Sequence, residues 1–391
     1  MKLIFVHPNL GLGGAEQLII QLAHGMQLRG HEIIIFTNYF NPDRCFDECK
    51  SLKIIQKYNL PNSIFNHGHV LFAWLKFLLL SIYIYFYESC DGFVVDQISI
   101  ANPLLQSKAP VYFYCHYPDL LLTGRNTLLK SIYRFPFDVL EKWTTNLAKV
   151  VFVNSNYTKQ VYLETFGNRE LVVLYPGTNF VKYNGPSLWE SKQNVVLSIN
   201  RFERKKRIDR AIKAFSKLKA TAVLVIAGGY DTQLLENKDY LMDLEQLCDE
   251  LKLTHSTLEG SSIDKIPLNT QVVFILSFTD DQKRWLLSHS KILLYTPSNE
   301  HFGIVPIEGL AYGLPVIAMK SGGPMETIVH GESGYLCKDV PQIDCLEMSN
   351  YMTKILENKQ LWTDLSRFSK KRYVSKFSVD AMLLAFEENL D

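Results

Sequence analysis

The chain has 391 residues, with 41 Lys plus Arg against 40 Asp plus Glu, and 47% of its residues are hydrophobic. This near-neutral balance speaks against a nucleic-acid-binding protein, which would carry a strongly basic face, so we expect no nucleic-acid partner. The length is sufficient for two domains with cores of their own. The seven cysteines form no Cys-x-x-Cys pair, which argues against a disulfide framework or a zinc site and favours a reducing compartment.

Short apolar runs alternate with helical patterns, such as residues 15–29, along nearly the whole chain. We expect strands in the first half at residues 3–6, 32–37, 92–95, 111–115, 150–153 and 171–174. In the second half we expect them at residues 195–200, 223–227, 272–276, 292–295 and 316–318. Continuous Val/Ile/Leu runs separated by helices are typical of parallel strands covered on both faces. The pattern predicts an α/β protein with two doubly wound parallel sheets.

Turn-forming residues mark a join between the two predicted domains near residues 176–193. We therefore expect one domain over residues 1–180 and a second over 190–375. A C-terminal helix within 376–391 would pack back on the first domain. Ligands of open parallel sheets bind outside the carboxyl ends of the strands, so two such sheets facing each other predict a ligand cleft between the domains.

The segment from Glu300 to Glu308 is the sharpest candidate for a site. It follows a predicted strand and opens a helix near Ile304. Loop amides and a helix N-terminus favour an anionic or hydroxyl-rich ligand, and carboxylates accept hydrogen bonds from sugar and ribose hydroxyls. A capped helix with two solvated glutamates would account for the same residues.

Four further segments follow predicted strands in both halves of the chain. They are the basic run 201–207, the glycine-rich run 11–14, the Gly-Gly-Pro run 322–324, and His116. Basic side chains suit a diphosphate, and glycines with free helix amides suit close approach to an anion. Each also has a simpler interpretation, namely a solvated loop, a turn before a helix, or a structural histidine. Their shared place at strand ends is what those interpretations do not explain.

Taken together, these motifs resemble family 4 of the glycosyltransferases, which has the GT-B fold of two facing Rossmann-like domains. The motifs are the pair Glu300-x7-Glu308, the upstream Arg201 and Lys206, and Gly13-Gly14 near the start. Longer runs are similar to mannosyltransferases of the dolichol pathway within that family. Those runs are residues 7–16, residues 114–123, Pro136-Phe137-Asp138 with Glu141, and residues 153–155.

The resemblance implies a retaining mannosyltransferase with GDP-mannose as donor. The acceptor would be Man1GlcNAc2 on dolichyl diphosphate, extended by an alpha-1,3 and then an alpha-1,6 mannose in lipid-linked oligosaccharide synthesis for N-glycosylation. The implied location is the cytosolic face of the endoplasmic reticulum membrane, where other transferases of the pathway would be candidate partners in a complex. The family works without a cofactor or metal, and the chain has no Asp-x-Asp motif.

The resemblance also assigns roles to the candidate residues. The first domain would bind the acceptor, with His116 near the reacting carbon, and the second would bind the nucleotide sugar. Arg201 and Lys206 would bind the donor diphosphate, Glu300 the transferred mannose and Glu308 the ribose. Further donor contacts would come from the backbone of Gly13, Gly14, Phe302, Gly303 and Ile304. Retention would follow from same-face attack guided by the leaving phosphate or from a covalent intermediate, and we favour the former by family analogy.

Other functions stay open from the sequence. They are a family 4 glycosyltransferase with another donor or acceptor, an epimerase of UDP-sugars with this fold, and a non-catalytic membrane scaffold. The retention of both glutamates and both basic residues argues against the scaffold.

Residues 70–87 form an apolar stretch whose only charge is Lys76, and no long apolar stretch follows near residue 391. A stretch of this length is at the lower limit for a membrane span. A single crossing would separate Gly13-Gly14 from His116, which leaves a buried core helix or a helix lying in the membrane interface.

We favour the interfacial helix, because a dolichol-linked acceptor is confined to the membrane. Trp74, Leu78 and Tyr85 would then face outward. A basic surface over residues 120–142, with Arg125, Lys130, Arg134 and Lys142, would face the lipid head groups.

Overall fold

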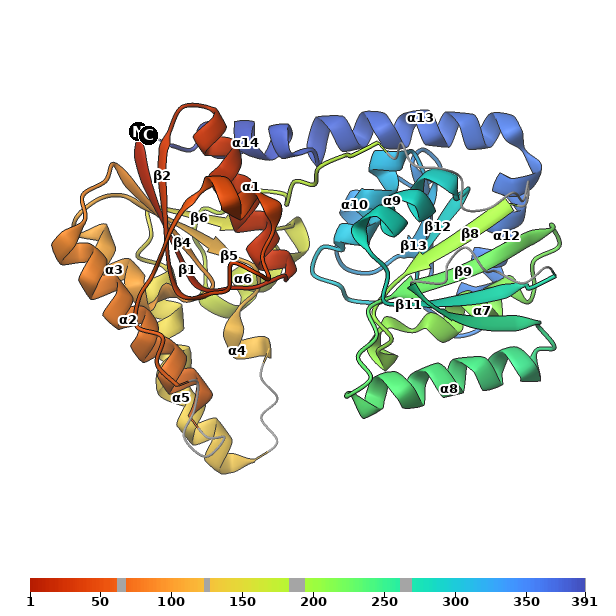
Figure 1. Cartoon of the computed structure of the whole chain (residues 1–391), viewed down its shortest axis with the longest axis horizontal. Helices are drawn as coiled ribbons and strands as arrows, with labels where there is room; N and C mark the ends of the chain where they lie inside the picture. The colour runs from red at the N-terminus through yellow and green to blue at the C-terminus, as the bar shows by residue number, and fades with distance from the viewer. Residues whose placement is uncertain (62–67, 123–126, 183–193, 261–268, 391) are drawn as a thin grey trace. The chain divides into compact units, whose positions relative to one another are not determined.

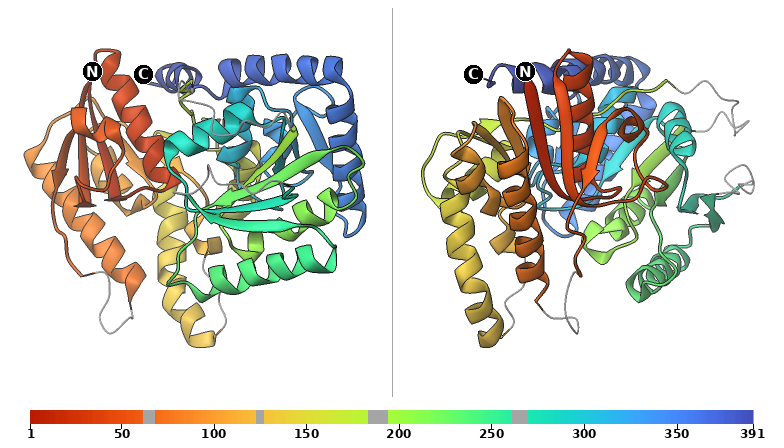
Figure 2. Two further views of the ribbon diagram at one scale, coloured as in Figure 1. Left: turned by 45° about the vertical axis from the view of Figure 1, so that its right-hand side comes forward. Right: turned by 60° about the vertical axis from the view of Figure 1, so that its left-hand side comes forward.

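The computed structural model describes residues 1–61, 68–122, 127–182, 194–260 and 269–390 (Figures 1 and 2). It divides into two compact units, one of Met1–Gly177 with Val379–Asp391 and one of Thr178–Ser378. Each unit holds a seven-stranded sheet in which every strand pairing is parallel. The predicted α/β fold with two doubly wound sheets is thus confirmed. Part of the expected join, residues 183–193, lies outside the described residues.

The first unit has the strand order β3-β2-β1-β4-β5-β6-β7. Its strands are β1 (Lys2–Leu10), β2 (Glu32–Phe40), β3 (Lys53–Gln56), β4 (Gly92–Asp96), β5 (Val111–Cys115), β6 (Val150–Val153) and β7 (Val172–Val173). Its α-helices are α1 (Gly14–Leu28), α2 (His69–Tyr87), α3 (Asn102–Gln106), α4 (Asp119–Leu122), α5 (Leu128–Thr145), α6 (Asn156–Phe166) and α14 (Val379–Glu387), and short 3₁₀ turns lie at Asp47–Ser51 and Ser99–Ala101.

Alternation along the strands assigns the two faces of this sheet. Leu3 and Phe5 of β1 pack with the buried side chains of α1 and α14, whereas Ile4 and Val6 pack with those of α2, α3 and α6. The C-terminal helix α14 approaches α1 closely, since a Cβ at Gly25 would lie 2.4 Å from a Leu383 methyl carbon. The chain therefore completes its first core with its last helix (Figure 1).

The second unit has the strand order β10-β11-β9-β8-β12-β13-β14. Its strands are β8 (Asn194–Ile199), β9 (Ala222–Gly228), β10 (His255–Glu259), β11 (Val272–Leu276), β12 (Ile292–Tyr295), β13 (Val316–Met319) and β14 (Gly334–Cys337). Its helices are the 3₁₀ turn Arg204–Lys206 and α7 (Ile208–Phe215), α8 (Leu235–Glu250), α9 (Asp280–His289), α10 (Ile304–Tyr312), α11 (Pro324–Thr327), α12 (Ile343–Glu357) and α13 (Lys359–Lys376). Buried residues of α7, α8 and α12 form one core with the sheet.

All the strands expected from the sequence are present, and the structure adds β3, β10 and β14. These three are edge strands, each with a single neighbour in its sheet. An edge strand has less of its surface buried, so its sequence need not be a continuous apolar run. The segments KIIQ and HSTLE, with mixed burial, illustrate why they were not recognised.

Helix α2 turns a different face outward from the one expected. Trp74 is only 9% exposed and packs edge-to-face on Phe137 of α5, with ring centroids 5.4 Å apart, so its predicted outward orientation is wrong. Leu78 and Tyr85 are half-buried. The exposed apolar residues are Leu71, Leu75, Ile82, Phe86 and Tyr87. Within the described residues, α2 is the one helix long and apolar enough to cross a membrane, and a third of that stretch is buried inside the protein.

The expected basic surface over residues 120–142 is also only partly present. Arg134 is buried and contacts Asp119 at 2.8 Å, so its predicted place on that surface is wrong. Lys130 and Lys142 are exposed, and Arg125 lies outside the described residues.

Glu141 joins α5 to the short helix α4. Its carboxylate accepts hydrogen bonds from the backbone N–H groups of Asp119 (2.7 Å) and Leu120 (3.1 Å), while Arg134 bonds the Asp119 side chain. Burial raises the pKa of Glu141 to about 7, although the Asp119 hydrogen bond acts to lower it. The inner face of α5 thus holds the segment that follows His116.

This raised pKa predicts a pH-dependent stability. Because the folded pKa exceeds the ordinary value of 4.5, the contribution of neutral Glu141 is full below pH 4.5 and is lost as the pH rises through about 7. The effect is on the order of 3 kcal/mol at most. The Glu141→Gln variant has no titrating group at this position. Its melting temperature should therefore increase relative to that of wild type as the pH rises from 5 to 8. The exposed Glu170→Gln should follow wild type, and parallel pH profiles for wild type and Glu141→Gln would contradict the prediction.

Candidate active site

Two loops meet at the carboxyl end of the second sheet. The Arg201–Lys206 segment follows β8 and the Glu300 loop follows β12, and these strands are neighbours. The ammonium of Lys206 hydrogen-bonds to the Glu300 carboxylate as an ion pair. The Thr296 hydroxyl donates to the Lys206 carbonyl oxygen at 2.8 Å, which ties the two backbones together. The structure thus brings together two residues that are 94 positions apart in the chain.

Arg201 lies at the start of the same segment but pairs differently. Its guanidinium is 2.9 Å from the Glu203 carboxylate, and its side chain is 64% exposed. Lys205 pairs with the other oxygen of Glu203 at 2.9 Å. A Cβ at Gly228 of the neighbouring β9 would lie 1.7 Å from the Asn200 carbonyl oxygen, so the absence of a side chain there lets the segment sit against the sheet. Arg201 is therefore reachable by a ligand at this end of the sheet.

Helix α10 begins at Ile304, as predicted, after Gly303 in the left-handed region at φ +85°. Glu308 lies in its second turn and pairs with Lys283 of α9 at 2.8 Å. Burial acts to lower the pKa of Lys283, but the Glu308 carboxylate outweighs it and the pKa is raised. Lys283 was not predicted, because nothing in its own helix distinguishes it from a surface lysine.

The Gly322-Gly323 loop supports the Glu300 backbone. The Gly323 N–H donates to the Glu300 carbonyl oxygen at 2.8 Å, and a Cβ at Gly322 would lie 2.3 Å from that same oxygen. Gly322 has a φ of +62°, which favours glycine. The expectation that this loop faces an anion is therefore wrong for the Gly323 amide, which is already used within the protein.

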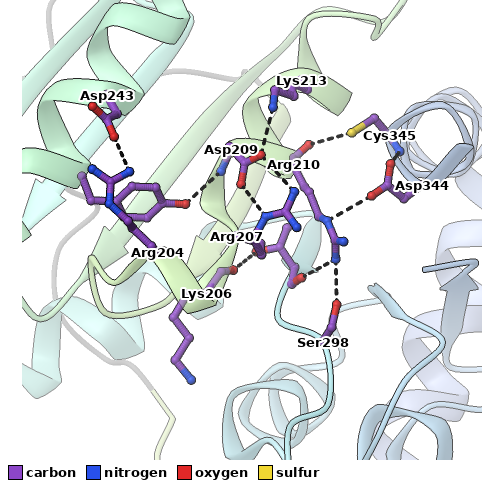
Figure 3. Close-up of polar contacts among 12 residues, drawn as sticks. Arg204, Lys206, Arg207, Asp209, Arg210, Lys213, Asp243, Ser298, Asp344 and Cys345 are labelled. Carbon is purple, nitrogen blue, oxygen red and sulfur yellow. Dashed lines mark hydrogen bonds and ion pairs between the residues drawn. The ribbon is translucent and has the colours of Figure 1, made fainter. Parts of the chain in front are cut away.

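A buried arginine that sequence reasoning missed connects the two loops to the core. Arg210 of α7 is 4% exposed and donates to the Ser298 hydroxyl at 2.8 Å. It also pairs with Asp339 (2.7 Å) and with Asp344 of α12 (3.0 Å). Figure 3 shows Arg210 directed at Ser298 and Asp344, while the side chain of Lys206 extends away from this network. Arg210 thereby fixes the stretch of chain that leads to Glu300.

In the first unit, His116 lies directly after β5, where it was expected. Its Nε2 is 2.8 Å from Oδ1 of Asp96, the last residue of β4, and its carbonyl oxygen accepts from Asn154 Nδ2 at 2.9 Å. His7 of β1 contacts the other oxygen of Asp96 at 2.7 Å. Burial disfavours the charged Asp96 carboxylate, but the contacts with His116 and His7 outweigh it and lower the pKa to about 2. Neither Asp96 nor His7 was predicted as part of the site.

The glycine-rich run also lies at a strand end. Gly13 is the residue before α1, and Gly14 is its first residue, so the free amides of that helix start there, as expected. In the described part of the chain, no group of three or more His, Cys, Asp or Glu side chains is arranged to hold a metal ion.

Comparisons with known protein families cover nearly the whole chain. The family described as "Glycosyltransferase Family 4" matches residues 12–181, and "Glycosyl transferases group 1" matches residues 182–372. The described geometry agrees with known structures in fold. Sucrose-phosphate synthase from Thermosynechococcus elongatus has a TM-score of 0.75 at 18% identity and covers 99% of this chain and 98% of its own. WaaG, a glycosyltransferase involved in lipopolysaccharide biosynthesis, has a TM-score of 0.67 at 17% identity with the same coverage.

Curated relatives are considerably more similar in sequence. The alpha-1,3/1,6-mannosyltransferase of Rhizomucor pusillus is 38% identical, over 97% of this chain and 89% of that protein. Those of Kluyveromyces lactis and Neurospora crassa are 43% and 39% identical, over 84% and 100% of this chain and 71% and 90% of their own lengths. With both family models matched and these relatives aligned over most of their length, the chain belongs to the alpha-1,3/1,6-mannosyltransferases of glycosyltransferase family 4, which have the GT-B fold.

Proposed function

We propose that the protein transfers mannose from GDP-mannose to Man1GlcNAc2 on dolichyl diphosphate, first in alpha-1,3 and then in alpha-1,6 linkage, with retention of configuration. Its place would be the cytosolic face of the endoplasmic reticulum membrane. Membership of the mannosyltransferase family supports this reaction. The observation that carries the proposal is the contact of Lys206 with Glu300 at the ends of neighbouring strands, because a sugar diphosphate presents an anion and hydroxyl groups next to each other.

The donor diphosphate competes with the Glu300 carboxylate for the Lys206 ammonium. The diphosphate attracts the Lys206 ammonium and the exposed Arg201 guanidinium, which can bind phosphate oxygens in a bidentate manner. Glu300 is then released from its ion pair and accepts hydrogen bonds from mannose hydroxyls. The amides of Phe302, Gly303 and Ile304 contact the donor at the start of α10.

Other residues bind the remaining parts of the donor. Glu308 accepts from the ribose hydroxyls and is held in place by Lys283. The amides of Gly13 and Gly14 contact the donor from the start of α1. No cofactor or metal takes part.

The reaction follows from the movement of charge. As the bond between mannose C1 and the phosphate oxygen breaks, positive charge develops on the sugar and negative charge on the diphosphate, which Lys206 and Arg201 stabilise. The acceptor hydroxyl forms its bond to C1 on the same face. Its proton passes to the departing phosphate oxygen, so no protein base is consumed. His116 lies near the reacting carbon on the acceptor side.

A lipid-linked acceptor calls for a membrane-binding surface, and α5 supports one. Its exposed residues form a stripe at helical spacing: Leu128, Ile132, Phe135, Val139 and Trp143, each more than half exposed. The exposed charges on α5 are Lys130 and Lys142. Its two acids, Asp138 and Glu141, lie on the inner face and contact Arg134 and the α4 backbone.

Helix α2 extends this surface. It packs against α5 through Trp74 and Phe137, and the Tyr133 hydroxyl of α5 accepts from the Leu71 N–H at 3.3 Å. Its own stripe of Leu71, Leu75, Ile82 and Phe86 is exposed at the same spacing. Apolar stripes with lysines as their exposed charges fit a bilayer that contains anionic lipids. We therefore propose that α2 and α5 rest in the membrane interface.

The transfer itself can be tested with purified protein. With GDP-mannose and Man1GlcNAc2 on a dolichyl or phytanyl diphosphate, linkage analysis should give an alpha-1,3 mannose followed by an alpha-1,6 mannose. UDP-glucose should give no product. Turnover of donor without acceptor would indicate an epimerase, and transfer to a different acceptor or from a different donor would contradict the proposal.

The donor site is tested by single substitutions. Lys206→Ala and Arg201→Ala should each lower kcat/KM by roughly 100- to 1000-fold, because they remove charge that stabilises the leaving group. Glu308→Ala should chiefly raise KM for the donor. Glu300→Gln should lower kcat yet bind GDP as well as wild type or better, since Lys206 is no longer neutralised.

Lys205→Ala is the matched control for these variants, because Lys205 is an exposed lysine of the same segment that pairs with Glu203. It should keep the wild-type rate within a few fold. Near-normal transfer by Lys206→Ala, or an effect of Glu300→Gln on donor KM alone, would remove these residues from their assigned roles.

Membrane binding is tested by flotation with vesicles of phosphatidylcholine and phosphatidylserine. A variant with Ile132, Phe135 and Trp143 changed to serine should bind at least tenfold more weakly, because each large apolar side chain contributes about 1.5–3 kcal/mol when fully buried. The same change at the exposed Leu235 and Met242 of α8 should have no effect. If the α5 variant floats like wild type, or if wild type binds a partner transferase but no vesicle, the surface has another occupant.

A further inference from the structure

Three polar residues of the first unit meet at the ends of three neighbouring strands. The order β1-β4-β5 places His7 beside Asp96, and His116 follows β5 by one residue. His7 and Asp96 are fully buried, whereas the side chain of His116 is 23% exposed. The solvent-reachable member of the group is therefore the residue proposed to lie on the acceptor side.

His7 has a hydrogen-bond partner at each of its two ring nitrogens. Its Nδ1 is 2.7 Å from Oδ2 of Asp96, and its Nε2 is 3.1 Å from the carbonyl oxygen of Asn9. Both partners are acceptors, so the ring satisfies both contacts when both nitrogens carry hydrogen. His7 thus hydrogen-bonds to the Asp96 carboxylate, and a buried charge needs such a partner.

Asp96 also contacts His116, through its other carboxylate oxygen. The Nε2 of His116 is 2.8 Å from Oδ1 of Asp96. This contact places a hydrogen on Nε2, which leaves Nδ1 as the other polar atom of the ring. The Tyr114 ring lies against His116, with centroids 4.6 Å apart. Burial raises the pKa values of Tyr114 and Cys115 well above their ordinary ranges, so neither adds a charge here.

We infer that His7 and Asp96 are positioning residues that fix the ring orientation and tautomer of His116, with His7 holding the Asp96 carboxylate in place by a hydrogen bond. This inference rests on the proposed function, in which His116 lies near the reacting carbon. With a hydrogen on Nε2 alone, the His116 ring presents Nδ1 as an acceptor for a sugar hydroxyl. Without the His7–Asp96 pair the ring is free to rotate or to exchange its hydrogen, and the hydroxyl loses its fixed acceptor.

The test is a double-mutant cycle of His7→Ala and His116→Ala. His7→Ala should lower kcat by about 10- to 100-fold, the cost of a misplaced functional group, with donor KM unchanged. In the His116→Ala background it should lower kcat by less than threefold, because the residue through which it acts is gone. His7→Asn keeps a side-chain N–H for Asp96 and should recover most of the rate.

Two further measurements separate positioning from a general loss of structure. Melting temperatures of all variants show whether the fold is affected, and nitrogen chemical shifts of labelled histidine report the His116 tautomer, which should change in His7→Ala and be kept in His7→Asn. His24→Ala removes another hydrogen-bonded histidine of the same unit and should leave kcat unchanged.

The outcomes distinguish the positioning role of His7 and Asp96 from the placement of His116 on the acceptor side. Additive losses in the cycle, or an unchanged His116 tautomer in His7→Ala, would overturn the positioning role. Wild-type transfer by His116→Ala would instead overturn the placement of His116 at the acceptor side, whatever His7→Ala does.

Discussion

Both sheets are built from parallel strands that are covered by helices on each face, and this constraint decides where chemistry can occur. The middles of the strands are fully buried and apolar, as at Phe5, Val94 and Leu293. A polar side chain there would lose its hydration without gaining a partner. Polar groups therefore collect where the strands end. In a parallel sheet the carboxyl ends of all the strands lie on the same side of the sheet. Asp96 and the segments that carry His116, Lys206 and Glu300 all follow from this rule.

Charges at these strand ends are held in pairs within the protein. Lys206 contacts Glu300, Lys283 contacts Glu308, and Arg210 contacts two aspartates. A buried or half-buried pair adds little stability by itself, yet removing one partner leaves an uncompensated charge. In the proposed reaction an anionic donor exchanges partners with Lys206, whereas Arg210, which is 4% exposed, keeps its contacts and holds the loops in place. The half-buried Lys206–Glu300 pair is the one proposed to open to the donor, and the buried contacts of Arg210 preserve the geometry.

The sequence predicts the class of fold, the central strands and the loops at their ends, because each depends on local composition. It does not reveal the edge strands β3 and β10, which lack continuous apolar runs, or the edge strand β14, which is only four residues long and begins with Gly334. Nor does it reveal contacts such as His7 with Asp96, 89 positions apart, because these depend on the order of strands in the sheet. The outward face of α2 was misjudged at Trp74, since a helix that is apolar on all sides gives no signal of its orientation.

Helix α5 has the reverse of the usual pattern, with apolar residues such as Phe135 outside and Arg134 and Glu141 inside. Its inner face holds the backbone of Asp119 and Leu120, three and four residues after His116. Its outer face is the one proposed to rest on lipid. The same rigid element would thus set both the depth of the protein in the interface and the position of the segment that carries His116. For an acceptor whose lipid cannot leave the membrane, this connection would fix the distance between the bilayer surface and the segment that carries His116, which flexible attachment would leave variable.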